Sequence, residues 1–162
     1  MKLEKIIETA SEVLNVQDPA ILKRCANLVL GNIAANYRDC IATQIFTVTT
    51  EKIQYSQFEK TFLKVKSVIH GGQEVDYSLF VDFVKVPNGK VTVEYCYIPV
   101  FVNANDDITV PNLSEQCFVY GVLTEYAIIS GMFNEAKIWG EKFEQGLFTS
   151  NPKYKQLVLP RR

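Results

Sequence analysis

Near the start of the chain, apolar residues recur every three to four positions, which is the period of an amphipathic α-helix. The stripe consists of Leu3, Ile6, Ile7, Ala10, Val13 and Leu14. Asp18 followed by Pro19 predicts the start of a second helix, because aspartate caps free N–H groups and proline at the first helical position loses no hydrogen bond. This helix is expected to run to about Tyr37 and is apolar on more than one side, which favours a central position or one between partners.

From Cys40 onward the pattern changes to alternation of apolar and polar residues, which is typical of β-strands. We expect four strands: Ile41–Thr50, Phe62–Ile69, Ser78–Val86 and Lys90–Val100. Pro87-Asn88-Gly89 predicts a turn that pairs the last two strands, since proline fixes the first turn position and glycine accepts positive φ.

Alternation also predicts which side chains of these strands share a face. In the second strand we expect one face to hold Leu63, Val65, Ser67 and Ile69, and the other Lys64 and Lys66. In the fourth strand the expected core residues are Val91, Val93, Tyr95 and Tyr97. Its second face is therefore wet or shared with a partner.

Helical spacing returns after a polar link, with Ser114 placed to begin a third helix. Its apolar stripe is wide and consists of Phe118, Val119, Val122, Leu123, Tyr126 and Ile129. Gly131 is placed to end that helix in a left-handed cap, and a fourth helix should run from about Phe133 or Asn134 to Leu147. The short link predicts an antiparallel helical hairpin.

The order of elements predicts an α+β fold: two N-terminal helices, a mostly antiparallel β-hairpin region, and a C-terminal helical hairpin with an extended tail. With 162 residues, 48% of them hydrophobic and 22% charged, the composition is that of an ordinary globular protein. We expect one domain over residues 1–148 and an extended C-terminal arm over residues 149–162.

Charge and cysteine content narrow the classes of function. The 17 basic and 18 acidic side chains give no overall attraction to nucleic acid or to an anionic membrane. No apolar stretch is long enough for a spanning helix, and the N-terminal residues do not resemble a secretory signal, so we expect a cytosolic protein without a membrane partner. The four cysteines form no C-x-x-C pair, which favours reduced, partly buried thiols over a zinc or redox site.

Catalytic chemistry has little support in the sequence. His70 is the single histidine and precedes Gly71-Gly72 at an expected turn. At such a position an exposed histidine without a catalytic role is favoured over a catalytic base. Nucleophile-elbow, phosphate-loop and dinucleotide motifs are absent. We therefore expect no enzymatic activity, no catalytic residue and no cofactor.

Two further groups of residues could bind a ligand or could have only a structural role. Asp106 and Asp107, with Glu115 nearby, could hold a hard cation, but their spacing is not that of a calcium loop and a solvated acidic loop is favoured; we predict no metal site. Aromatic residues of the fourth helix could stack on bases, but core or subunit contacts are favoured for Phe133, Trp139, Phe143 and Phe148.

The C-terminal arm combines basic residues with a β-prone apolar run. Its candidate docking residues are Tyr154, Lys155, Leu157, Val158, Leu159, Arg161 and Arg162. The functional interpretation is an extended arm that adds a strand to a neighbouring subunit or partner, and the alternative is a solvated terminus.

Four features of the chain occur together: the element order, the segment Tyr95-Cys96-Tyr97-Ile98-Pro99, the acidic link at Asp106-Asp107, and the helical hairpin Glu125–Lys137, which reads EYAIISGMFNEAK. In these features the chain resembles the head-to-tail connector or adaptor proteins of tailed bacteriophages over about residues 1–148.

This resemblance implies a structural virion protein of the neck, assembled in the bacterial host cytoplasm. Such adaptors usually form rings of twelve copies beneath the portal protein, extend the channel through which viral DNA passes, and carry other neck or tail proteins. The wide apolar stripes point separately to an oligomer interface, with candidates Phe118, Val122, Tyr126, Phe133, Trp139 and Phe143. A small α+β binding domain or a nucleic-acid-associated protein with no identified ligand remains the alternative.

Overall fold

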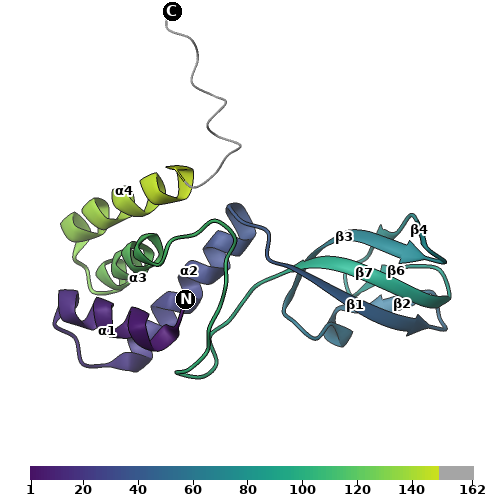
Figure 1. Ribbon diagram of the computed structural model, residues 1–162, viewed down its shortest axis with the longest axis horizontal. Helices are drawn as coiled ribbons and strands as arrows, with labels where there is room; N and C mark the ends of the chain where they lie inside the picture. Colours follow the sequence, from purple (N-terminus) through teal and green to yellow (C-terminus); the bar gives the residue numbers. More distant parts are fainter. Residues whose placement is uncertain (150–162) are drawn as a thin grey trace, which may run out of the picture. The chain divides into compact units, whose positions relative to one another are not determined.

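The computed structural model describes residues 1–149, and these residues divide into two compact units (Figure 1). One unit, here the helical unit, comprises Met1–Tyr37 and the described residues from Val100 to Thr149. The other, the β unit, is the continuous segment Arg38–Pro99. The α+β class and the order of helices and strands are therefore confirmed. The expectation of a single domain over residues 1–148 stays a prediction, because two compact units can still unfold as one.

The helical unit contains four α-helices among the described residues, with bounds close to those expected. They are α1 Leu3–Leu14, α2 Pro19–Asn36, α3 Glu115–Ile129 and α4 Phe133–Thr149. The predicted cap of α2 is present, since the Asp18 carboxylate accepts a hydrogen bond of 2.9 Å from the Ala20 amide. The Ser114 hydroxyl likewise accepts one of 3.1 Å from the Cys117 amide at the start of α3.

The turn between α3 and α4 has the predicted left-handed glycine, with φ of 74° at Gly131. The Gly131 amide donates to the Ile128 carbonyl at 3.2 Å, and the Met132 amide donates to the Ala127 carbonyl at 2.8 Å. This pair of bonds is a Schellman motif, which satisfies carbonyls left free at the end of α3 and reverses the chain. The predicted helical hairpin is confirmed.

Close packing of α3 on its neighbours depends on two glycines. A Cβ atom at Gly121 in α3 would lie 2.8 Å from Val29 Cγ1 in α2 and 3.0 Å from Phe143 Cε2 in α4. A Cβ atom at Gly146 in α4 would lie 2.6 Å from Cys117 Sγ. The helices thus approach one another where side chains are smallest.

A loop between the β unit and α3 is fixed to α2 by side-chain hydrogen bonds. The Asn27 amide group donates to the Phe101 carbonyl at 3.1 Å and accepts from the Phe101 amide at 2.8 Å. The Lys23 ammonium donates to the Val102 carbonyl. Phe101 is buried, and its ring contacts that of Phe118 in α3, so this loop is part of the core of the helical unit.

The β unit consists of two antiparallel sheets that enclose one core. The first has strand order β1-β7-β3-β4, with bounds Ile41–Val48, Gly89–Tyr97, Phe62–His70 and Gln73–Glu74. The second has order β2-β6-β5, with bounds Lys52–Gln54, Phe83–Lys85 and Ser78–Leu79, and a short 3-10 helix, Tyr55–Gln57, follows β2. Both sheets contribute to a shared core of Val48, Ile53, Phe58, Val65, Val68, Val84, Val86, Val91, Val93 and Tyr95.

The predicted hairpin between Ser78–Val86 and Lys90–Val100 is wrong. Ser78–Val86 is two short strands, β5 and β6, which pair with each other, and β7 pairs with β1 and β3 instead. Gly89 has the predicted positive φ, at 111°. The turn at Pro87-Asn88-Gly89 therefore passes the chain from one sheet to the other, with the Asn88 side chain accepting a bond of 2.6 Å from the Glu51 amide.

The predicted face of the second strand is wrong as well, because β3 contains irregularities. Its register against β7 shifts between Phe62 and Lys64 and again between Val65 and Ser67. Each shift moves later side chains to the other face, since strand side chains alternate with a period of two. Val65 and Val68 are consequently buried, whereas Ile69, expected beside Val65, is exposed.

Candidate interaction surfaces

The six residues predicted to form a subunit interface do not share one surface. The core of the helical unit takes up the side chains of Phe118, Val122 and Phe143. Tyr126 and Trp139 are half-buried. Phe133 at the start of α4 is 71% exposed and is the member of this set most available to a partner.

Exposed apolar side chains also lie on both sides of the α3–α4 turn. Ile128 and Ile129 end α3, Phe133 begins α4, and all three are exposed. Large apolar side chains close together on a surface mark interaction sites more often than scattered ones do. We call these three residues the turn patch.

The β unit carries a second exposed apolar surface on its four-stranded sheet. Ile41 and Ile45 of β1 and Ile69 of β3 are exposed, while the side chains on the opposite face of the sheet form the core. Sequence alternation identified this face as wet or shared, but it did not place Ile69 there because of the shifts in β3.

A third exposed group lies at the tip of the β5–β6 hairpin and was missed by sequence reasoning. Leu79, Phe80 and Val81 are consecutive and exposed, Val81 to 93%. The run was assigned to the interior of one long strand, where alternate residues would be buried. Asp82, directly after the run, was the available indication of a turn.

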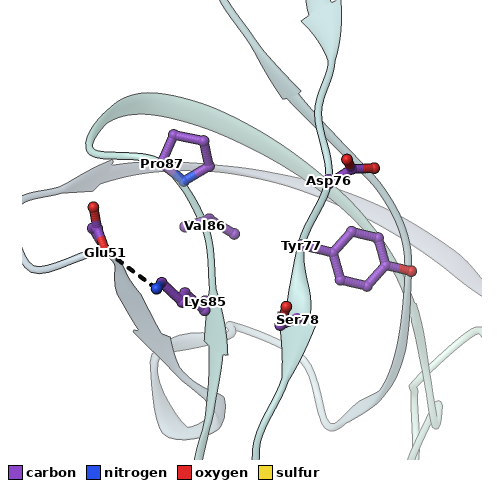
Figure 2. A pocket seen from close by; sticks show the side chains of 7 residues that line it. All are labelled: Glu51, Asp76, Tyr77, Ser78, Lys85, Val86 and Pro87. Carbon is purple, nitrogen blue, oxygen red and sulfur yellow. Dashed lines mark ion pairs between the residues drawn. The ribbon is translucent and has the colours of Figure 1, made fainter.

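An open cleft of about 390 Å³ lies on the β unit (Figure 2). Its lining comes from the ends of short strands and the loops beside them: Glu51, Asp76, Tyr77, Ser78, Lys85, Val86 and Pro87. Figure 2 shows the Lys85 ammonium directed toward Glu51, with which it forms an ion pair of 3.6 Å, while the Tyr77 ring points to the other side. Because this pair neutralises both charges, Asp76 is the remaining charge along the described lining.

The three acidic residues that could have bound a cation, Asp106, Asp107 and Glu115, instead interact with backbone amides, the N-terminus and a lysine. The Asp106 carboxylate accepts bonds of 2.7 Å and 2.6 Å from the Asn103 and Val102 amides, and these bonds lower its pKa. Asp107 accepts from the Met1 ammonium at 2.6 Å, which lowers the pKa of that carboxyl also. Glu115 forms an ion pair of 2.7 Å with Lys5. Within residues 1–149, no three His, Cys, Asp or Glu side chains are grouped to hold a metal ion.

The lowered pKa of Asp106 predicts an acid-sensitive loop. Its contribution to stability is present above the ordinary aspartate pKa of about 3.9 and is lost as pH falls through the lower folded value. Asp106→Asn should therefore reduce the loss of stability between pH 5 and pH 3, measured by urea unfolding at each pH. Glu141→Gln, which removes an exposed carboxylate from α4, is the control; an equal reduction in that variant would contradict the assignment.

The cysteines and the single histidine, the remaining candidates, lie in packed surroundings. Cys25, Cys40, Cys96 and Cys117 are buried, as predicted for thiols that pack in a core, and burial raises the pKa of Cys25, Cys40 and Cys96. His70 ends β3 and is half-buried rather than exposed, with Nδ1 lying 3.2 Å from the Lys90 carbonyl oxygen.

The docking residues of the predicted arm, from Tyr154 to Arg162, lie outside the described residues, and Thr149 is the last residue of α4. No helix in residues 1–149 has the length and apolar character to cross a membrane. No protein-family model matches the chain, and no curated protein matches it significantly.

Proposed function

We propose that this chain is a structural, non-enzymatic subunit of a ring between the portal and the tail of a bacteriophage. The ring would extend the channel through which viral DNA passes. The observation that carries the self-association part is the exposed apolar surface on each unit: the turn patch, and the sheet and hairpin residues of the β unit. Burial of such surface is the main driving force for subunit association. The position in the virion rests on the resemblance in element order described above.

The C-terminal arm is the proposed contact with the portal protein. Residues 150–162 carry Lys153, Lys155, Arg161 and Arg162 and no acidic side chain, and they contain the β-prone run Leu157-Val158-Leu159. An extended segment of this kind can add a strand to an exposed sheet edge, with its charges meeting acidic residues at the rim.

Two measurements test the proposal on the full-length protein. Sedimentation velocity and negative-stain microscopy of the purified protein, alone and with portal protein from the same genome, should show rings or portal-bound rings. A protein that stays monomeric at high concentration and does not associate with portals would overturn the proposal.

Ending the chain at Thr149 should abolish portal binding while keeping the four described helices, because every described residue of α4 is retained. Pull-down with the portal and far-ultraviolet circular dichroism measure the two effects. Replacing the four basic residues of the arm by glutamine is the matched variant, and it should weaken binding most at low salt, where charges are least screened. Portal assembly that survives the truncation would remove the arm from the proposal, and DNA binding at low salt that survives it would favour the nucleic-acid alternative.

A further inference from the structure

The outer face of the four-stranded sheet has an uncharged row across three strands, bordered on β7 by Lys90 on one side and by Glu94 on the other. Thr92 of β7 pairs with Ile45 of β1 on one side and with Ile69 of β3 on the other, so the three residues form one row. Ile41 lies on the same face of β1, four residues before Ile45. We call Ile41, Ile45, Ile69 and Thr92 the open face.

The β1 edge of this sheet lacks charged residues, proline and a bulge, which are among the features that normally prevent association. β1 is an edge strand in regular register with β7 over Ile41–Val48, and it contains no charged residue and no proline. Sheet edges of monomeric proteins are normally protected by lysine, proline or a bulge. Ile45 is 59% exposed, so both the edge and the face beside it are suited to contact another protein surface.

The tip of the β5–β6 hairpin presents apolar side chains on a fixed backbone. The Phe80 amide donates to the Phe83 carbonyl at 2.9 Å, and the Tyr55 hydroxyl donates to the Phe80 carbonyl at 2.6 Å. The Phe80 and Phe83 rings stack with centroids 4.6 Å apart. Because the tip residues Leu79, Phe80 and Val81 are already ordered, little conformational entropy remains to be lost on binding.

One copy of the chain cannot cover its own open face with this tip. The tip belongs to the three-stranded sheet, and the core of the β unit lies between that sheet and the inner face of the other. The open face is the opposite side of the four-stranded sheet, directed away from the three-stranded one. Because the tip and the open face lie on different sides of one small unit, contact between them requires two copies of the chain.

Charged residues border both surfaces. Asp82 is exposed beside Val81 at the tip. On the sheet, Lys90 of β7 is exposed and pairs with Thr47 in the row next to that of Thr92, whereas Glu94 borders that row on its other side and Glu74 of β4 pairs with Ile69. Asp82 is therefore favoured on the Lys90 side. In the described residues neither side chain is within ion-pair distance of an opposite charge in its own copy. A tip lying on the open face can therefore gain an ion pair between copies.

We propose that Leu79, Phe80 and Val81 of one copy pack on the open face of a second copy, with Asp82 close to Lys90 of that copy. This inference rests on the proposed self-association and specifies the residues of the β unit through which the copies associate. The two patches differ, so the contact is heterologous and repeats from copy to copy, which generates a ring when the rotation closes.

Cross-linking between copies tests the pairing directly. Single variants Val81→Cys and Ile45→Cys are mixed and oxidised; the four native thiols are buried and should not compete. We expect a disulfide-linked dimer from the mixture, at a yield several times that of either variant alone. A dimer from Ile45→Cys alone would indicate edge-to-edge pairing, and one from Val81→Cys alone would indicate tip-to-tip contact; either would overturn the proposal, as would no cross-link in a protein that forms rings.

Substitutions give an independent measurement on the native assembly. Val81→Asp should weaken self-association by roughly tenfold or more in sedimentation, since it removes an apolar side chain that the proposed contact would bury and places a charge there. Val102→Asp is the control, because Val102 is an apolar residue of the helical unit that is 65% exposed. Asp82→Lys and Lys90→Asp should each weaken association and together restore it.

The outcomes separate this inference from the proposed function. Rings that form normally with Val81→Asp would overturn the hairpin contact and leave the ring itself intact. Binding of the wild-type protein, but not of Val81→Asp, to phosphatidylcholine vesicles without self-association would instead assign the tip to a lipid surface and overturn the inference.

Discussion

Asn27→Ala should lower the free energy of unfolding by about 2–4 kcal/mol, the largest single effect we expect in the helical unit. The Asn27 side chain makes two hydrogen bonds to the backbone of Phe101, as a neighbouring strand would. Removing it leaves an N–H and a carbonyl without a partner next to a buried aromatic ring, and each such loss costs about 1–3 kcal/mol. The loop that connects the β unit to α3 would lose its main attachment to α2.

Urea unfolding followed by Trp139 fluorescence measures this effect, since Trp139 is the single tryptophan and lies in α4. Asn36→Ala is the matched control: Asn36 also lies in α2, is exposed, and bonds to Asn32 one turn earlier. Its replacement should change stability by less than about 0.5 kcal/mol. Equal effects of the two substitutions would mean that the Phe101 contact does not hold the loop.

Gly121→Ala should destabilise the helical unit by up to about 2 kcal/mol, although alanine is the better helix former. The added Cβ would lie 2.8 Å from Val29, closer than Cβ atoms approach their neighbours in proteins, and 3.0 Å from Phe143, which is a tight contact. Overpacking of a core typically costs about 1–3 kcal/mol, which exceeds the gain of about 1 kcal/mol from helix propensity. Helices α2 and α4 would have to move apart around α3.

Gly140→Ala separates propensity from packing. Gly140 lies in α4, and its added Cβ would meet Thr124 Cγ2 at 3.6 Å, an ordinary contact. This variant should be as stable as the wild type or up to about 1 kcal/mol more stable, measured by the same unfolding curves. If Gly121→Ala were stabilised to the same degree, the close approach at Gly121 would be contradicted.

Local chemistry predicted the helices well because their ends depend on neighbouring residues. Asp18, Ser114 and Gly131 each act within a few positions of themselves, and each is found in the expected role. The strands depend on distant partners. The turn at Pro87-Asn88-Gly89 has the chemistry of a hairpin, yet β7 finds its neighbours in β1 and β3, far along the sequence.

The candidate surfaces were predicted less well than the fold for a related reason. A wide apolar stripe shows that a helix is covered, but it does not show whether its own chain or a partner covers it. Phe118 and Val122 prove to be covered by the helical unit itself. Exposure of the Leu79–Val81 tip follows from two short strands where one long strand was expected, and no periodicity in that run distinguishes the two cases.

Placement of Arg38–Pro99 as one continuous insertion has a consequence for biosynthesis. The β unit is complete once Pro99 has left the ribosome, whereas α1 and α2 must wait for Phe101, α3 and α4 before their apolar sides are covered. Since domains fold as their residues emerge, we expect the insertion to fold first and the nascent N-terminal helices to be the segment that chaperones bind.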